Sequence, residues 1–476
     1  MVFSSPTFLF LFLPAVLIAV WVAPVRLRRF ILLGAGLGFY AWGVQTFVLV
    51  IIASTFVDWA LARGMARAQA QGRARLARGL LIVGLLQNLG LLAWFKYATF
   101  ASEQVARLAD VLSIGNPGTL QILLPIGISF FTFEKVSYLV DVWRRDVEAR
   151  RDPLDVLLFV SLFPRSIAGP IVRLREIQHD LRRPQPRVDQ VQAGAIRFAH
   201  GLAKKVLIAD QIAPIADAAF AASADGSLTS GSAWLGMLAY SLQLYFDFSA
   251  YSDMAIGIGM MLGFRLPENF DRPYSSVSVT EFWRRWHMTL SRWFRDYVYI
   301  PLGGNHGSAR ATSRNLLIVF ALTGVWHGAG WTFLIWGMYH GAWLLIERRM
   351  GWRGLEGPVR WRWARRASLL LIVMLGWVLF RAESLHVALE YYAAMFSFTG
   401  GAVPAVADAA TTQAMVVLLL SCVIFVLPGT SSGGRFLIDG LGPRAMAARI
   451  AVMVLLPLAL VMALSGDYSP FLYFQF

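Results

Sequence analysis

The stretch that decides the fold reads LLIVFALTGVWHGAGW and occupies residues 316–331. This apolar run contains one titratable side chain, His327, close to its end. An imidazole at membrane depth is costly, and ionisable groups that persist there usually have a function. A second histidine, His287, closes the segment EFWRRWH at residues 281–287. The two histidines are therefore the first candidates for chemistry.

The composition indicates a polytopic membrane protein. Hydrophobic residues make up 57% of the 476-residue chain and charged residues only 15%, which argues against a soluble globular protein. Apolar stretches of spanning or near-spanning length occur at 7–24, 30–62 (long enough for a hairpin), 79–96, 117–140, 154–170, 232–263, 314–326, 331–346, 367–380, 413–427 and 448–464. We expect an all-α fold with roughly ten to twelve membrane passes, some of them short.

The basic residues predict the topology. The net charge of +15 is carried mainly by arginines in short connections, namely 63–78, 144–151, 173–187, 348–366 and 435–449. The positive-inside rule assigns such connections to the cytoplasm and the N-terminus to the outside. Residues 1–5 lack the positive region of a secretory signal, so the first apolar run should remain as a helix. Nucleic-acid binding is disfavoured, because the arginines are dispersed among apolar spans.

Several site classes have little support in this chain. The single cysteine, Cys422, excludes disulfides and cysteine zinc sites and is expected to be a small core residue. The glycines between Gly257 and Gly263 lack a strand context for nucleotide binding and favour close helix packing. No internal repeat or low-complexity linker is evident, so we expect one membrane-embedded domain over residues 1–476, with the core motifs at 120–345.

Residues 278–300 predict an amphipathic helix at the membrane interface. Ser278 and Glu281 fit a capping box, in which each side chain satisfies an amide at the helix start. At 100° per residue, one face is apolar and the other charged. The apolar face would hold Trp283, Trp286, Leu290, Trp293, Phe294 and Tyr297, and the charged face Arg284, Arg285, Arg292, Arg295 and Asp296.

His287 lies at the margin between these two faces, where an imidazole could meet both a cavity and a charged ligand. A purely structural histidine would explain this position equally well. Arg284 and Arg285 would suit an anionic ligand, such as the phosphates of a coenzyme or a lipid headgroup. Arginines that only snorkel into solvent are the alternative.

His327 precedes Gly328 and Gly330, which weaken the helix and allow backbone or substrate to approach. We therefore expect His327 to line a cavity, the alternative being a buried histidine bonded to a carbonyl. His340 would point to the opposite side of a continuous helix, and neither its spacing nor the ligand count fits zinc. A lone histidine can act as a general base that deprotonates a hydroxyl as it attacks an activated acyl carbon.

Two carboxylates, Asp247 and Asp253, fall in the apolar span at 232–263. Buried acids need partners. We expect both to pair with polar side chains that hold helices together, and not to act as catalytic acids.

These motifs together resemble the membrane-bound O-acyltransferase (MBOAT) family, and within it the membrane subunits of bacterial alginate O-acetyltransferases. The matching segments are MVFSS (1–5), LPIGISF (124–130), IAGPI (167–171), YFDFSAYSDMA (245–255), ENF (268–270), EFWRRWH (281–287), RDY (295–297), LGGN (302–305) and WHGA (326–329). The resemblance covers residues 1 to about 395. Arg165 departs from the pattern, because His, Gln or Lys is expected there.

The resemblance implies a ring of transmembrane helices, with interfacial and re-entrant helices, around a central funnel. It implies that His327 and His287 are catalytic, and it associates Trp326 and Asn269, with Arg284 and Arg285, with substrate binding. No bound cofactor or metal is implied. The acetyl donor would be cytoplasmic acetyl-CoA, and the acetyl group would cross the bacterial inner membrane to periplasmic acetyltransferase or acceptor proteins and an exported polysaccharide. Membrane lipid would surround the chain, and nucleic acid would not be a partner.

The same motifs fit acylation of peptidoglycan, cellulose or teichoic acid, so the polymer stays open. A different class of protein, a transporter or polysaccharide-export component, would also place polar groups inside the membrane. Transporters commonly contain inverted repeats with interrupted helices in both halves. Here the histidine-bearing interfacial segment occurs in one half only.

We expect both chain termini to lie outside the cytoplasm and the number of crossings to be even. The first apolar run precedes a basic cluster, and Arg444 and Arg449 precede the last one. Alkaline phosphatase and fluorescent-protein fusions at each end measure this directly. A cytoplasmic location for either end would contradict the assignment.

Overall fold

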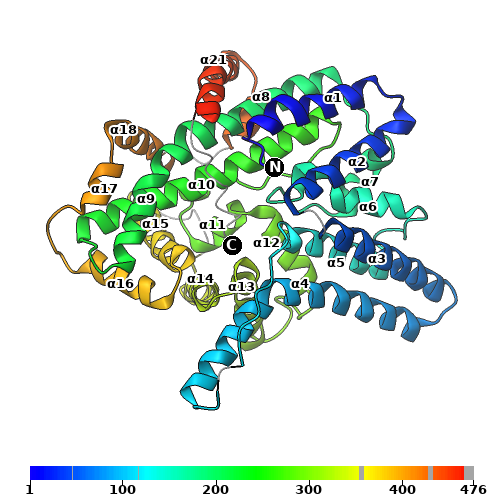
Figure 1. Cartoon of the computed structure of the whole chain (residues 1–476), viewed down its shortest axis with the longest axis horizontal. Helices are drawn as coiled ribbons and strands as arrows, with labels where there is room; N and C mark the ends of the chain where they lie inside the picture. The colour runs from blue at the N-terminus through cyan, green and yellow to red at the C-terminus, as the bar shows by residue number, and fades with distance from the viewer. Residues whose placement is uncertain (45–46, 116, 353–358, 427–431, 466–476) are drawn as a thin grey trace. The chain divides into compact units, whose positions relative to one another are not determined.

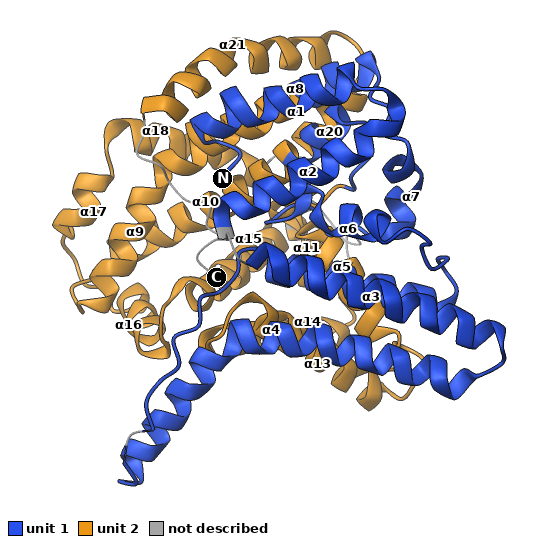
Figure 2. Ribbon diagram, turned by 45° about the vertical axis from the view of Figure 1, so that its right-hand side comes forward, with its two compact units in different colours: residues 1–195, 255–267 blue, residues 196–254, 268–476 orange. Residues whose placement is uncertain are grey.

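A computed structural model describes the chain except for residues 45–46, 116, 353–358, 427–431 and 466–476. Every regular element among the described residues is a helix (Figure 1). Contacts divide the chain into two compact units, coloured separately in Figure 2. Unit 1 comprises residues 1–195 and 255–267, and unit 2 comprises residues 196–254 and 268–476. The single membrane-embedded domain stays a prediction.

Unit 1 contains the N-terminal helices. Its elements are η1 (Phe8–Phe12), α1 (Leu13–Val22), α2 (Val25–Val44), α3 (Phe47–Ala70), α4 (Ala74–Val111), α5 (Ile128–Arg144), α6 (Pro153–Ser161), η2 (Phe163–Arg165) and α7 (Leu174–Arg182). It also holds the start of α8 (Val188–Lys204) and the end of α10 (Ser230–Met261). Helices α3 and α4 lie side by side as an antiparallel hairpin (Figure 1), and α4 is much the longer.

Unit 2 contains the rest of α8 and α10 and both predicted histidine segments. Its other elements are η3 (Lys205–Ala209), α9 (Asp210–Ala224), η4 (Pro273–Ser275), α11 (Val279–Arg285), α12 (Met288–Phe294), η5 (Arg295–Tyr299), α13 (Ala309–His327), α14 (Trp331–Arg349), α15 (Val359–Arg381), α16 (Leu385–Phe396), α17 (Pro404–Ala409), α18 (Thr412–Ser421), α19 (Val423–Val426), α20 (Gly433–Asp439) and α21 (Pro443–Ser465). Helices α13 and α14 form its most extensive helix pair.

Five helices in the described part of the chain are long and apolar enough to cross a membrane. They are Phe47–Ala70, Ala74–Val111, Val188–Ala224, Trp361–Arg381 and Pro443–Ser465, and shorter apolar helices occupy Phe8–Val22 and Thr412–Phe425. The stretch 30–62 falls on α2 and α3, of which α3 is a candidate span, and residues 45–46 between them lie outside the described residues. The predicted stretch 413–427 ends at a residue outside the described part of the chain. The C-terminus, which we expect outside the cytoplasm, also lies outside the described residues.

Two predicted apolar stretches are helical over only part of their length. The stretch 117–140 is helical only from Ile128, because Pro117, Gly118 and Pro125 interrupt its first half. The stretch 154–170 ends its helix at Ser161, and Pro164 follows in a 3₁₀ turn. A nine-residue helix such as α6 is far shorter than a bilayer core of about 30 Å requires.

One long helical segment was missed. Residues 188–224 form α8, η3 and α9 in an almost continuous run. The run carries Arg197, Lys204 and Lys205 in its first half, and it still contains a window apolar enough for a membrane span. The structure pairs all three cations with carboxylates inside unit 2.

Buried ion pairs hold the helices of unit 1 together. Lys135 on α5 lies 3.0 Å from Asp58 on α3, and both side chains are fully buried. Asn88 on α4 donates a 2.7 Å hydrogen bond to the other oxygen of Asp58, so three helices meet at one carboxylate. Arg165 is also fully buried, where it pairs with Glu134 and lies over the Phe159 ring. Arginine at position 165, where the family resemblance predicts His, Gln or Lys, therefore makes contacts inside unit 1.

Glycines set the spacing between α13 and α14 in unit 2. A Cβ atom at Gly324 would come within 2.2 Å of the Phe333 carbonyl oxygen, and one at Gly337 within 2.2 Å of the Phe320 carbonyl oxygen. At the turn, a Cβ atom on Gly328 would lie 2.1 Å from the Phe333 ring. Small residues let membrane helices approach closely in this way. The backbone after His327 therefore lies against the chain's own aromatic ring.

Candidate active site

His287 lies at a break between two short helices. The structure ends α11 at Arg285 and starts α12 at Met288, and His287 itself has a left-handed backbone, with φ 43°. The continuous helix predicted over 278–300 was therefore wrong. The predicted Ser278 cap is present, since Ser278 accepts from the Glu281 amide at 3.0 Å, whereas Glu281 accepts from the Val277 amide at 3.0 Å in place of the Ser278 amide.

The backbone around this break is held by residues 269–271. The Met288 amide donates to the Asn269 carbonyl, and the Asp271 amide donates to the Arg285 carbonyl, each at 2.9 Å. These two bonds bracket His287. The chain can therefore adopt the strained conformation at His287 because the neighbouring loop over-determines it.

The Asn269 side chain defines which His287 nitrogen carries the proton. Its Oδ1 accepts hydrogen bonds from the Thr289 amide at 3.2 Å and from Thr289 Oγ1 at 2.8 Å. An amide N–H can only donate, so the contacted atom is the oxygen of Asn269. His287 Nδ1 lies 3.2 Å from the same oxygen and must donate to it. In the neutral ring, Nε2 is then the nitrogen that can accept a proton.

The surroundings keep the His287 ring uncharged. Its side chain is buried, and the rings of Phe248 and Phe270 lie 4.8 and 6.5 Å from it between centroids. Burial lowers the pKa of the His287 imidazole to about 3. The imidazole is therefore neutral at pH 7, as a general base must be before it accepts a proton.

His327 is the last residue of α13 and is also buried. Its ring contacts the rings of Trp326, Trp336 and Phe380, at centroid distances of 4.8, 5.1 and 5.1 Å. The Trp326 ring lies 6.1 Å from the His287 ring as well. The structure thus brings both predicted catalytic histidines, Trp326 and Asn269 together in unit 2.

His340 does not lie on the same helix as His327. The chain turns at residues 328–330, so His340 belongs to α14, and its ring contacts Trp336 at 5.2 Å, as the His327 ring also does at 5.1 Å. The two histidines therefore belong to separate helices, as the separate apolar stretches 314–326 and 331–346 indicate, and both rings contact Trp336. Among the described residues, no three His, Cys, Asp or Glu side chains gather closely enough to hold a metal ion.

Arg284 and Arg285 have different environments. Arg285 pairs with Glu281 at 2.8 Å, one helical turn earlier, and its side chain is 20% exposed. Arg284 is exposed and lines two cavities of unit 2, with volumes of about 490 and 710 Å³. Neither of these cavities is lined by His287 or His327. The sequence predicted one role for both arginines. In the structure, Arg285 stabilises its helix and Arg284 lines cavities.

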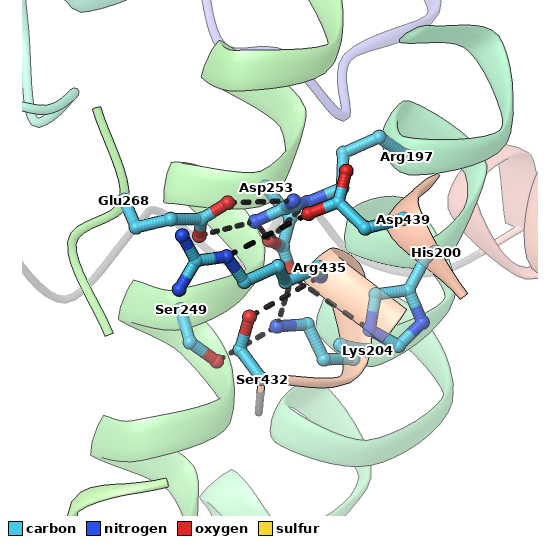
Figure 3. A network of polar contacts seen from close by, with 9 residues as sticks. All are labelled: Arg197, His200, Lys204, Ser249, Asp253, Glu268, Ser432, Arg435 and Asp439. Carbon is cyan, nitrogen blue, oxygen red and sulfur yellow. Dashed lines mark hydrogen bonds and ion pairs between the residues drawn. The ribbon is translucent and has the colours of Figure 1, made fainter. Parts of the chain in front are cut away.

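A buried charge network lies beside the loop that holds His287. Arg197 Nε donates to Asp253 at 2.6 Å, and its two Nη atoms donate to Glu268 at 3.0 and 2.7 Å (Figure 3). Lys204 pairs with Asp253 at 2.5 Å and donates to Ser249 at 2.9 Å. Glu268 directly precedes Asn269, so the bidentate Arg197 contact anchors the loop one residue before the side chain that binds His287.

The expectation that Asp247 and Asp253 pair with polar side chains is confirmed. Asp253 binds Arg197 and Lys204, and Asp247 binds Lys205 at 2.9 Å. Gly434 on α20 packs against this cluster, because a Cβ atom there would lie 2.2 Å from Arg197 Nε. Both acids therefore form ion pairs that join α10 to the α8–η3 segment.

Several residues of the site were not singled out from the sequence. Thr289 shares the Asn269 oxygen with His287, and Trp336 and Phe380 contact His327. Trp336 could have been found if the glycines after His327 had been read as a turn between two helices. Phe380, which belongs to α15, carries no local signal, and Arg197 falls in the stretch that the hydropathy pattern left out.

Comparisons with known proteins identify the family. The family model for MBOAT, the membrane-bound O-acyltransferase family, matches residues 79–385. The chain is 42% identical to a protein of Azotobacter vinelandii named a probable alginate O-acetylase, AlgI, over the full length of both chains. It is 46% identical to the AlgI of Pseudomonas aeruginosa over 84% of this chain and 75% of that one.

A peptidoglycan O-acetyltransferase of Helicobacter pylori is 35% identical over 84% of this chain and 80% of its own. The matches thus include proteins named for different acceptors, and all of these relatives are named for acetyl transfer to oxygen. The chain belongs to the membrane-bound O-acyltransferase family and is a multi-pass membrane O-acyltransferase.

Proposed function

We propose that this protein takes an acetyl group from cytoplasmic acetyl-CoA and passes it across the bacterial inner membrane for O-acetylation of an exported polysaccharide. The observation that supports this most strongly is the pair of buried histidines, His287 and His327, whose rings both contact Trp326. A buried imidazole suits proton transfer during acyl transfer. We assign His327 as the general base and His287 as the second catalytic histidine.

The proposed step needs no metal. The imidazole removes the proton of the acceptor hydroxyl as its oxygen attacks the thioester carbonyl of the donor. A carbon–oxygen bond forms, the carbon–sulfur bond breaks, and the proton returns from the imidazole to the departing thiolate. The aromatic rings around His327 exclude water that would otherwise hydrolyse the thioester. Trp326 and Asn269 shape the site, the first by contact with both histidines and the second by orienting His287.

Alginate or an alginate-like polymer is the proposed final acceptor. The match to proteins named as alginate O-acetylases reaches 42% identity over both full chains, whereas that to the peptidoglycan O-acetyltransferase is 35% over 84% of this chain. Since the polymer lies outside the cytoplasm, periplasmic acetyltransferase or acceptor proteins would receive the group. We also propose the ring of roughly ten to twelve transmembrane helices around a funnel, with the described spans as part of it.

His327→Ala should abolish acetyl transfer in purified protein reconstituted into lipid nanodiscs. Loss of a general base commonly lowers the rate by about two to four orders of magnitude. Release of labelled acetyl groups from acetyl-CoA measures the rate, and size-exclusion chromatography checks the fold. A well-folded variant with at least half the wild-type rate would exclude His327 as the base, and a wild-type protein that never consumes acetyl-CoA would exclude this donor.

Arg284→Gln should raise the Michaelis constant for acetyl-CoA more than it lowers turnover, because contacts to donor phosphates act as uniform binding. Arg285→Gln should instead lower the thermal stability, since it removes the partner of Glu281. Arg310→Gln, an exposed arginine at the start of α13, is the matched control for charge. An unchanged Michaelis constant in a stable Arg284→Gln variant would leave that arginine without a donor role.

His287→Ala should lower turnover, because we assign His287 as the second catalytic histidine.

Asn269→Leu should lower turnover by about tenfold to a hundredfold, because it leaves His287 Nδ1 and the Thr289 amide without their shared acceptor. Asn269→Asp retains an oxygen at the same place and should recover much of the loss. The Michaelis constant for the donor should change little in either variant. Equal losses in both variants would show that the residue supports the loop without orienting His287.

A further inference from the structure

A basic cavity in unit 1 is not accounted for by acyl transfer. It has a volume of about 790 Å³, within the range of roughly 300–1,000 Å³ that small-molecule sites occupy. Three connections that the sequence assigns to the cytoplasm meet there: 63–78 contributes Arg63, 144–151 contributes three arginines, and 173–187 contributes Arg182. Its wall also includes Ala66, Gln69 and Ala70 from the last turns of α3, a candidate membrane span.

The charge of this cavity is strongly one-sided. The arginines that line it are Arg63, Arg145, Arg150, Arg151 and Arg182, and Glu148 is the acidic residue among its lining side chains. Arg182 has a distant carboxylate, Asp155, at 3.9 Å. Within the described chain, no hydrogen bond or ion pair joins the guanidinium groups of Arg63, Arg145 or Arg151 to another side chain. Positive charge therefore exceeds what the protein itself neutralises.

Arg150 shows that the cavity is built and not merely a gap between flexible side chains. It is only 7% exposed, its Nη2 donates to Gln178 at 2.9 Å, and its buried Nε finds no partner among the described residues. Its backbone is held on both sides, because the Trp59 indole donates to its carbonyl at 2.9 Å and its amide donates to the Tyr138 hydroxyl at 3.1 Å. Arg150 therefore forms a fixed part of the cavity wall, positioned by its own side-chain and backbone hydrogen bonds.

We infer that this cavity binds a phosphate group at the cytoplasmic surface of the membrane. Guanidinium groups match phosphate oxygens in geometry and charge, and several converging arginines are typical of phosphate recognition. Two sources supply this chemistry at such a position: the headgroup of an anionic phospholipid and a soluble polyphosphate compound. The position beside the end of α3 suits the first, since anionic lipids attract basic segments next to a span. The inference does not depend on the proposed acetyl donor.

The test compares two variants of the full chain that each lose three positive charges from unit 1. Arg63→Gln/Arg145→Gln/Arg151→Gln alters the cavity, and Arg73→Gln/Arg75→Gln/Arg78→Gln alters exposed arginines of the 63–78 connection and the start of α4 that do not line it. Native mass spectrometry measures retention of phosphatidylglycerol against phosphatidylcholine. Titration calorimetry in uncharged detergent measures binding of inorganic pyrophosphate.

The cavity variant should weaken binding by about tenfold or more, and the control by less than about threefold, because distant exposed charges are screened at physiological salt. Glu148→Gln should strengthen binding, a gain that a misfolded protein would not produce. Selective phosphatidylglycerol retention identifies a lipid headgroup, and pyrophosphate binding identifies a soluble source. Absence of both in the wild-type protein, or equal losses in the two triple variants, would overturn the inference.

Discussion

The candidate site in unit 2 depends on one interaction, the ion pairs that the buried Arg197 guanidinium forms with Asp253 and Glu268. A charge inside an apolar protein must be neutralised where it stands, because an unpaired buried ion costs far more than the pair. Neutralisation here requires α8, α10 and the segment that begins at Glu268 to converge on one side chain. The next residue, Asn269, then lies where it can hold His287. The placement of His287 thus follows from an electrostatic requirement two contacts away.

The sequence predicted the parts of this arrangement that depend on general rules. Asp247 and Asp253 were expected to bind partners because buried acids must, and they do. The cations of residues 188–224 follow the same rule, since Arg197 and Lys204 are surrounded by carboxylates inside a helical run that is long and apolar enough to cross a membrane. A pattern along one segment contains no information on its partners in another.

The break at His287 has a similar origin. Periodicity over 278–300 does favour a helix, and both α11 and α12 follow it. The interruption comes from hydrogen bonds with residues 269–271, which replace helical bonds on either side of the histidine. His327 differs because its glycines do mark the turn locally. The sequence therefore singled out His287, His327, Trp326 and Asn269, whereas Thr289, Trp336 and Phe380 required the tertiary structure. The tautomer of His287 and the shared contact with Trp326 required it as well.

The arginines show why net charge alone says little about their roles. The positive-inside rule explains why a chain with a charge of +15 gathers arginines in its connections, but it treats them all alike. In the structure, Arg197 forms ion pairs with two carboxylates, and Arg285 forms one with a carboxylate of its own helix. Arg150 is buried as well, but it lines a cavity that four further arginines share. Arginines that converge on one cavity with a single acidic residue among them leave positive charge that the protein does not neutralise, and this convergence distinguishes them from arginines that only mark the cytoplasmic side.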